Sequence, residues 1–465
     1  MKPGKSIWYV MLISLLVASC NMFVDESQQG RVFYLDPVAG SLDGDGSRSA
    51  PWPDLETFLA ADLIRTHHYT SYPWSEDSPI ILVHPDAPVQ AGDTLRLLPG
   101  HHGSIDIWES YNVSPITIEA EQRHAAMVSQ LHINSSSGFI IRGLTVRPDV
   151  GAEPGYASLV GVSGHNWRGP AHDVLVEDCY VYSTEDSSGW SKEDWNTWAF
   201  SGISANGDFI RIVDNELRNV NFGITYTGNF GIVQGNTIAN FAGDGMRGIG
   251  NDLLFEGNLV MDNYNVNGNH DDGFQSWSLG DRGQPPRERV VLRGNTIINN
   301  TDPDRPFQGG LQGIGCFDGF FIDWVVENNL VIVDHWHGIT FSGAIGVVVR
   351  NNTVVDPGFN RARAPWIRIS AHKDGRPSHD CRIQNNIAHA FSLPEAYGTA
   401  THNIQISSQD MLQELFRDPG ARDFRLKKGS AAIDAGRTAD RAVRDIEGIF
   451  RPRGQGVDVG AYESF

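Results

Sequence analysis

The chain has 465 residues, 40% of them hydrophobic, which is enough to build a large core. Its 36 lysines and arginines stand against 56 acidic residues, and the resulting formal net charge of −20 at pH 7 argues against nucleic acid as a partner. Fifty glycines indicate frequent turns, as a repetitive β architecture requires.

The N-terminus has the pattern of an export signal. Two lysines precede an apolar run from Ile7 to Ala18, which is too short to span a membrane. The letters VASC, which end at Cys20, resemble a bacterial lipobox, whose cysteine is lipidated after cleavage. We therefore expect a lipoprotein-type signal peptide over 1–19 and a tether over 20–30. The protein would then be exported and lipid-anchored in the bacterial cell envelope (outer membrane or periplasm), with Cys20 as its only membrane contact; after ordinary cleavage it would be secreted.

Three cysteines remain in the mature chain, Cys179, Cys316 and Cys381. An odd number implies no disulfide framework. Each lies in a strand-like context (VEDCYV, GIGCFD and HDCRIQ), so we expect buried, inert thiols.

The start of the mature chain carries a family resemblance. RVFYLDPVAGSLDGDGSRSAPWPDLETFLA, from Arg31, and VQAGDTLRLLPGHHGSIDI, from Val89, resemble the opening of secreted right-handed parallel β-helix proteins of the pectin-lyase-like, carbohydrate-active kind. The resemblance implies a first strand, a turn rich in Gly and Asp, an N-terminal capping helix and then the first coil. The cap would cover about 31–110.

A phrase of strand, polar turn and strand then returns eight times, and FIIRGLTV from Phe139 is a looser ninth copy. The eight copies begin at Asp173, Phe209, Phe230, Asp252, Arg289, Asp323, Gly346 and Asp380. Their spacing has a base period of about 22 residues, with insertions of roughly 12 to 15 residues in the longer turns. A period of this size suits three short strands per coil, and the leucine and helix pattern of leucine-rich repeats is absent. We therefore predict an all-β chain, a right-handed parallel β-helix whose long loops leave one face.

One position of the repeat is occupied by asparagine in seven copies and by Leu144 and Cys179 in the first two. The asparagines are Asn215, Asn236, Asn258, Asn295, Asn329, Asn352 and Asn386. Because equivalent residues of stacked coils lie about 4.8 Å apart, we expect an asparagine ladder that begins after Cys179.

The end of the chain resembles the closing segment of the same secreted group. The relevant stretches are DFRLKKGSAAIDAG from Asp423 and DIEGIFRPRGQGVDVGAYES from Asp445. We expect one β-helix domain over 31–465, closed by about 405–465, and a monomer.

A second strand of each coil is marked by a glycine, as in DDGFQSW and WHGITFS. Alternation of side chains sends the second residue after that glycine outward. The predicted outward row is Ser204, Thr225, Arg247, Gln275, Gly315, Thr340 and Arg368. Residues before the glycines become exposed only if they occupy the corner where the strand begins.

Stacking brings the row and the corners together in one ionisable cluster. Its members are Asp244, Arg247, His270, Asp271, Asp272, Gln275, Gln312, His335, His337 and Arg368. Within the stretch GNHDDGFQSWS the alternative is a polar turn, or a structural cation site in which Asp271 and Asp272 hold Ca²⁺. No other cofactor is expected. His335 and His337 have a spacing that would suit a metal, but with no third ligand in the sequence we favour hydrogen-bonding or acid/base roles.

The insertion TEDSSGWSKEDWNTWA carries three tryptophans, Trp190, Trp195 and Trp198. Flat aromatic faces beside charged groups suit a sugar-binding groove. The alternative is that these tryptophans hold a long loop on the solenoid.

The favoured function is a polysaccharide lyase that acts on an acidic polysaccharide. β-Elimination beside a uronate needs a base, positive charge at the carboxylate and a proton donor. Arg247, Arg368 and Lys373 supply charge, and His337 serves as base or acid. The predicted substrate-binding residues are His270, Gln275, Gln312, His335, Lys373 and the three tryptophans of the insertion.

The second hypothesis is a glycoside hydrolase. The order GDG, HDDGF, HGITFSG and IRIS resembles the motifs of the polygalacturonase family. This resemblance implies catalytic roles for Asp244, Asp271 and Asp272, an assisting role for His337 and substrate binding by Arg368. The sequence departs from that family at Gly243 and Ser370 and in an additional coil around Gly313. Two further hypotheses are a C5-epimerase, which would use nearly the same groups as the lyase, and a non-catalytic glycan-binding solenoid.

Overall fold

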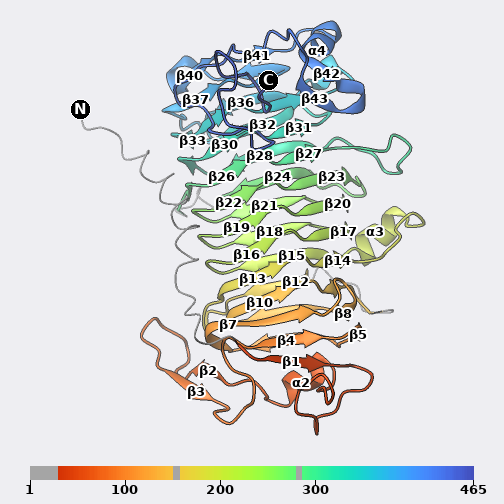
Figure 1. The fold of residues 1–465 in the computed structure, drawn as a ribbon. Helices are drawn as coiled ribbons and strands as arrows, with labels where there is room; N and C mark the ends of the chain where they lie inside the picture. Colours follow the sequence, from red (N-terminus) through yellow and green to blue (C-terminus); the bar gives the residue numbers. More distant parts are fainter. Residues whose placement is uncertain (1–29, 150–157, 279–284, 465) are drawn as a thin grey trace.

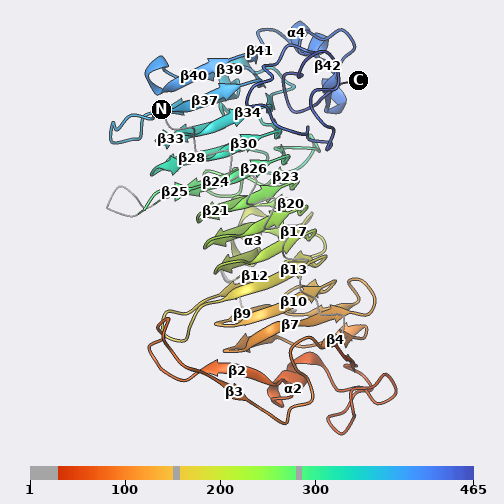
Figure 2. The same cartoon turned by 60° about the vertical axis from the view of Figure 1, so that its left-hand side comes forward.

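The computed structural model describes residues 30–149, 158–278 and 285–464, and it is a right-handed parallel β-helix (Figures 1 and 2). Each coil contributes one strand to each of three long parallel sheets, and the coils stack along one axis. The fold class predicted from the repeat is therefore confirmed. Cys20, at the predicted lipidation site, lies outside the described residues.

The first sheet has 15 strands. Its main path is β1 (Val32–Leu35), β4 (Thr94–Leu97), β7 (Tyr111–Ala120), β10 (Ser137–Arg142), β13 (His172–Glu177), β16 (Arg211–Val213), β19 (Ile232–Gln234), β22 (Leu254–Glu256), β26 (Val291–Arg293), β30 (Val325–Glu327), β34 (Val348–Arg350), β37 (Cys381–Gln384) and β40 (Gly398–Thr401). Strands β2 (Thr66–Tyr69) and β3 (Ile80–Val83) form an antiparallel hairpin at its N-terminal end.

The second sheet has 12 strands. They are β5 (Gly100–His101), β8 (Ala126–Val128), β11 (Thr145–Val146), β14 (Tyr180–Tyr182), β17 (Glu216–Val220), β20 (Thr237–Phe241), β23 (Leu259–Asn263), β27 (Thr296–Ile298), β31 (Leu330–Ile332), β35 (Thr353–Val355), β38 (Ile387–Ala388) and β41 (Ile404–Gln405).

The third sheet has 11 strands. They are β6 (Ile105–Trp108), β9 (Leu131–Asn134), β12 (Ser158–Ser163), β15 (Ser201–Asn206), β18 (Ile224–Thr227), β21 (Met246–Ile249), β24 (Asp272–Trp277), β28 (Gln312–Asp318), β32 (His337–Ser342), β36 (Trp366–Ser370) and β39 (Ala390–Ser392). A short fourth sheet joins β25 (Arg287–Glu288), β29 (Phe321–Ile322) and β33 (Ala344–Ile345).

The asparagine ladder lies in the turn between the first and second sheets. Each side-chain amide from Asn215 onward donates to the Oδ1 atom of the next asparagine over 2.9–3.0 Å. The backbone N–H of Cys179 donates to Asn215, so the ladder begins where the sequence predicts. It continues one coil beyond the prediction, to Asn403. Because these amides are buried and bonded, the ladder fixes how each coil sits on the next.

The interior is filled by the inward residues of all three sheets, mostly Val, Ile, Leu and Phe, in one continuous cluster. Cys179, Cys316 and Cys381 are free and buried, as predicted. Burial raises the pKa of Cys179 to about 12, so this thiol stays protonated and unreactive.

Both ends of the solenoid carry added structure. Helix α2 (Leu55–Ala60) lies beside β1 at the N-terminal end and buries Leu55 and Phe58, and it is the capping helix implied by the resemblance (Figure 1). At the other end lie α4 (Gln409–Leu415), β42 (Phe416–Asp418) and β43 (Asp423–Leu426). In the described ranges no helix reaches the length and apolarity that a membrane span requires.

Long connections leave the edge between the second and third sheets. The connection from β14 to β15 contains helix α3 (Lys192–Trp198), which projects beside the coils in Figure 1. The connections that precede β24, β28 and β36 lie along the same edge. The third sheet is therefore bordered by loops along the side where its strands begin.

A candidate active-site groove on the third sheet

The outward row on the third sheet has the predicted register. Pairing along the sheet runs in the order Ser204, Thr225, Arg247, Gln275, Gly315, Thr340 and Arg368. Because neighbouring strands lie about 4.8 Å apart, Arg247 and Arg368 are separated by about 19 Å along the axis. We call the surface between them, over β21, β24, β28, β32 and β36, the groove.

A network of carboxyl groups forms one end of the groove. Asp244 Oδ2 accepts a hydrogen bond from Arg247 Nε over 2.6 Å, and its Oδ1 accepts the backbone N–H of Asp272 over 2.9 Å. Asp272 Oδ2 in turn accepts from Gln275 Nε2 over 2.9 Å. The corner carboxyls therefore meet the outward row, as expected for residues at the start of each strand.

These carboxyl groups lie beneath the surface. Asp244, Asp271 and Asp272 are 1%, 3% and 0% exposed. The corner position gives their direction correctly, but Gln275 and Arg247 cover the carboxyls of Asp272 and Asp244. All three predicted catalytic carboxyls are therefore buried in this structure.

Burial also changes their protonation. Desolvation raises the pKa of Asp271 to about 7. The pKa of Asp272 is raised well above its usual value by burial and by the neighbouring charge of Asp244. Burial raises the pKa of Asp244 too, but the Arg247 guanidinium opposes that effect. The Arg247 guanidinium therefore favours the ionised form of Asp244, whereas burial and the Asp244 charge favour the protonated form of Asp272.

Gly315 makes room for Asp272. A β-carbon at Gly315 would collide with the Asp272 Oδ1 atom and with the ring of Phe317. The glycine in the outward row is therefore required by packing, because the Asp272 carboxyl occupies the space of a side chain. Phe317 in turn lies edge-on to His337, with ring centroids 4.9 Å apart, so the coil of β28 contacts the histidine of the next coil.

The other end of the groove is formed by aromatic and basic groups. His337 Nδ1 lies 3.0 Å from Thr340 Oγ1, and Trp366 Nε1 donates to the same hydroxyl over 2.9 Å. The Arg368 guanidinium lies 5.3 Å from the Trp366 ring centroid. Within the described part of the chain no carboxylate forms an ion pair with Arg368, so its charge is open to a ligand.

Two histidines stack at this end, with ring centroids 5.3 Å apart. The pKa values of His335 and His337 are both lowered to about 4, first by desolvation and then by nearby positive groups. His335 Nδ1 accepts the backbone N–H of His337, so this nitrogen carries no proton. Both imidazoles are therefore neutral near pH 7, and His270 lies exposed nearby.

Two substrate-binding predictions concern Gln312 and Lys373. Gln312 pairs with Asp272 across adjacent strands, and its Oε1 is buried without a hydrogen bond. Lys373 lies in the loop after β36, where its Nζ pairs with Asp318 over 2.6 Å. Lys373 is exposed at the far edge of the sheet, so the structure does not bring it to the carboxyl network.

The predicted calcium site has oxygen donors but few of them. Asp271 Oδ1 and Asp272 Oδ1 are buried without hydrogen bonds, like Gln312 Oε1. Within the described ranges no three His, Cys, Asp or Glu side chains form a group that could hold a metal ion. Oxygen donors suit Ca²⁺, but protonated carboxyls must first ionise to bind it.

The tryptophans of the insertion do not line the groove as a set. Trp195 is 1% exposed and stacks on Tyr264 with centroids 4.5 Å apart, and Trp190 lies edge-on to it. These two hold α3 on the solenoid, as the alternative interpretation proposed, whereas Trp198 is 41% exposed.

The groove instead takes its aromatic groups from the third sheet itself. Phe317 and Trp366 lie beside His337, and Trp277 lies beside Arg247. Each stands two residues from a member of the outward row, so the same alternation would have identified them. Phe222, one of the corner residues, lies under the Arg247 guanidinium at 3.6 Å from its ring centroid.

No protein-family model matches the chain, and no curated protein matches its sequence. Solved structures with a similar backbone include the pectate lyase Pel9A, with a TM-score of 0.48 and 16% identity over 94% of this chain and 97% of that one. A rhamnogalacturonan lyase has a TM-score of 0.40 and 13% identity over 84% of this chain and 94% of that one. The GH136 lacto-N-biosidase from Eubacterium ramulus has a TM-score of 0.46 and 13% identity over 86% of this chain and 70% of that one.

Proposed function

We propose that this right-handed parallel β-helix is a cell-envelope polysaccharide lyase that cleaves a uronate-containing polysaccharide by β-elimination. The observation that carries the proposal is the division of the groove. The carboxyl groups are buried, whereas Arg368, His337 and Gln275 are partly exposed and can meet a ligand. Hydrolysis would need accessible carboxyls, and elimination needs a base and a cation.

The step can be written with the groups present. The substrate carboxylate pairs with Arg368, which stabilises negative charge that develops on the uronate. The neutral His337 imidazole takes the C5 proton, the C4–C5 double bond forms and the C4–O bond breaks. The imidazolium then returns the proton to the leaving oxygen, so the histidine ends as it began and no other reactant is needed.

Substrate binding also raises the pKa of His337. Arg368 is one of the positive groups that lower it. A bound carboxylate offsets that charge, so the imidazole becomes more basic when the substrate arrives. Asp244 then acts as a positioning residue for Arg247, and Asp272 as one for Gln275.

A glycoside hydrolase remains the second candidate, because two adjacent aspartates have raised pKa values. Burial raises the pKa of Asp271 to about 7 and raises that of Asp272 well above its usual value, so one could act as base and the other as acid. This mechanism requires the corner to open, since both groups are buried. A C5-epimerase would use His337 and Arg368 as the lyase does, and a purely glycan-binding solenoid would need neither.

The test measures products and variants together. The mature protein is incubated with polyuronates and neutral glycans, with Ca²⁺ and with a chelator, while ultraviolet absorbance of unsaturated products and reducing ends are recorded. We expect both signals to rise on a polyuronate. Reducing ends alone would mean hydrolysis, altered uronate stereochemistry without cleavage would mean epimerisation, and silence across the panel would favour a binding protein.

Two substitutions then separate the mechanisms. For the lyase, His337→Gln should lower kcat by about 10²–10⁴-fold, whereas Asp272→Asn should leave it within about threefold. For the hydrolase the order is reversed, because Asp272 would be the acid. Thr225→Val, in the same outward row but outside the groove, is the matched control.

A further inference from the structure

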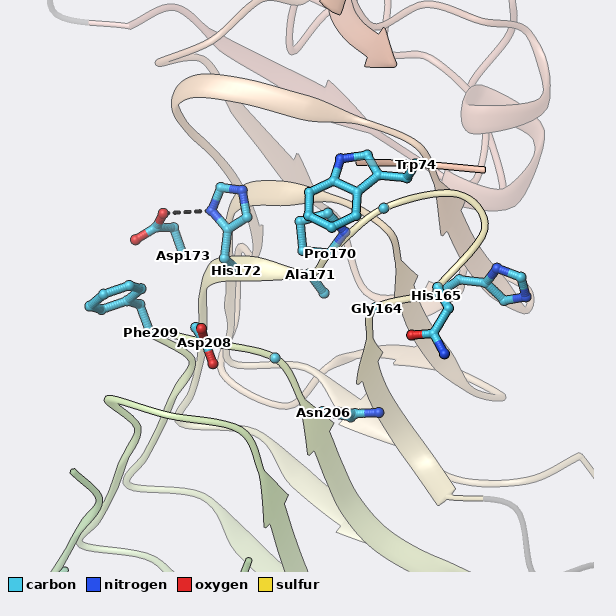
Figure 3. Close-up of a pocket in the computed structure, with 13 residues that line it drawn as sticks. Trp74, Gly164, His165, Pro170, Ala171, His172, Asp173, Asn206, Asp208 and Phe209 are labelled. Atoms are coloured by element: carbon cyan, nitrogen blue, oxygen red, sulfur yellow. Dashed lines mark hydrogen bonds and ion pairs between the residues drawn. The ribbon is translucent and has the colours of Figure 1, made fainter. Parts of the chain in front are cut away.

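A cavity lies outside the groove, at the opposite edge of the third sheet. It has a volume of about 480 Å³ and lies where β12 and β15 end and the chain turns toward β13 and β16. Figure 3 shows the His172–Asp173 pair and Phe209 at one side, His165 at the other and the Trp74 ring above. On the third sheet, β15 is three strands from β24, so the cavity lies about 14 Å along the axis from Asp272.

Phe209 belongs to an exposed aromatic pair. Its ring stacks on that of Phe230, one coil further, with centroids 4.9 Å apart and planes at 10°. The two residues are 49% and 47% exposed. Phe230 covers one face of Phe209, and Phe209 lies at the rim of the cavity (Figure 3).

The backbone at both phenylalanines is unusual. Both have φ of +57°, in the left-handed region that bulky side chains rarely adopt. The equivalent position is Asp173, Asp252, Arg289, Asp323, Gly346 and Asp380 in the other coils, and all of these also have positive φ. Aspartate and glycine adopt this conformation at low cost, whereas it is costlier for phenylalanine and for Arg289. Two adjacent phenylalanines, exposed and in a costly backbone conformation, are poor choices for stability alone.

The polar lining determines which ligand fits. The side-chain amides of Asn166 and Asn206 make no hydrogen bond within the described part of the chain. Asp208 Oδ1 accepts from Asn229, and its Oδ2 has no such partner. No lysine or arginine is found among the described residues that line the cavity, whereas Asp173 and Asp208 bring negative charge.

We propose that this cavity, with the Phe209 face, binds a neutral sugar of a glycan. A pyranose ring can stack its C–H face on an aromatic ring, while amides and a carboxylate bond its hydroxyl groups. The acidic lining of the cavity repels a uronate. The groove, in contrast, attracts a uronate through the positive charge of Arg368. The two sites therefore take different sugars, and the cavity holds a neutral portion of a polysaccharide whether or not the groove is catalytic.

The test uses Phe209→Asn in the full mature chain. Asparagine favours the left-handed conformation, so the thermal midpoint should stay the same or rise. The variant loses the aromatic face, so its affinity for a neutral oligosaccharide should fall by at least about tenfold. Binding is measured by titration calorimetry against gluco-, xylo-, manno- and galacto-oligosaccharides and against an oligouronate.

Two further variants make the outcome decisive. Phe450→Ala removes another exposed phenylalanine, 59% exposed and in the closing segment, and it should bind as the wild type does. Arg368→Ala should weaken binding of the oligouronate and leave the neutral sugar unaffected, which separates this site from the proposed function of the groove. The proposal is overturned if no neutral sugar in the panel binds in a Phe209-dependent way, or if Phe450→Ala weakens binding equally.

Discussion

The backbone N–H of Asp272 donates to Asp244 Oδ1 over 2.9 Å, which ties the buried Asp244 carboxyl to the backbone of the neighbouring coil. Arg247 lies against the same carboxyl and forms an ion pair with it. The Arg247 guanidinium favours the ionised form of Asp244, whereas burial and the charge of Asp244 raise the pKa of Asp272.

Asp271→Asn should change how stability depends on pH. The folded pKa of Asp271 is about 7 and the unfolded pKa of an aspartate is about 3.9, so only the folded state holds the proton between these values. The free energy of unfolding should fall as pH rises from about 4 to about 7, by up to about 4 kcal/mol. Urea unfolding of both proteins across this range measures the difference. His335 and His337 give the opposite slope, but they do so in both proteins. Parallel curves would contradict the prediction.

Gly315→Ala should lower stability by about 1–3 kcal/mol, because the new methyl group meets the Asp272 carboxyl. The double variant with Asp272→Ala removes that contact, so its effect should be smaller than the sum of the single effects. Chemical unfolding of the four proteins measures this coupling. Ser204→Ala, in the same outward row, should change stability by less than about 0.5 kcal/mol. Additive effects would show that the two residues do not share the space.

Arg368→Ala should lower kcat/KM on a polyuronate by about 10²-fold, because the free cation that pairs with the substrate carboxylate is lost. Stability should change little, since Arg368 makes no ion pair in the described residues. Steady-state kinetics at low and high salt measure the effect, and the wild type should be the more salt-sensitive protein. Equal salt dependence in the two proteins would mean that a residue other than Arg368 recognises the charge of the substrate.

The pH profile of kcat/KM reports on His337. This ratio follows the free enzyme, so the wild type should gain activity as pH rises through about 4, where the imidazole loses its proton. Arg368→Ala removes one of the charges that lower this pKa, so the acidic limb of the variant should move to higher pH. An unmoved limb would mean that another group sets it.

Cys20→Ser should release the protein from the membrane fraction if the N-terminus is lipidated. Partition into detergent and mass spectrometry of the mature N-terminus measure the change. Cys316→Ser, a buried thiol, is the control that should stay membrane-bound. Release of the wild type into the soluble fraction would instead favour ordinary secretion.

The register of the groove could be predicted from the sequence because alternation along a strand is a local rule. Ser204 to Arg368 follow it in every coil. The ladder was predicted for the same reason, and its last member was missed because Asn403 follows Asn386 after only 17 residues. Regular spacing of the asparagines therefore predicts members of the ladder, but it misses a member where a coil is shorter than the others.

The burial of the carboxyls could not be predicted in this way. It depends on Gln275 and Arg247 folding over them and on the space above Gly315, which are contacts between coils. The left-handed backbone at Phe209 was hidden too, since phenylalanine gives no sign of it. Long side chains and special turns are set by neighbours that a repeat pattern does not specify.

The coil of β28 lies between the coil of Asp272 and the coil of His337. Because each coil from Asn215 to Asn403 offers the same ladder and sheet bonds to its neighbours, a whole coil could be added or removed there without leaving a backbone group unpaired. The distance from the carboxyl network to the imidazole can therefore change only in steps of about 4.8 Å. In such a scaffold, the length of a binding site changes by the insertion or deletion of whole coils. Smaller changes in the distance between its groups depend on side chains such as Phe317.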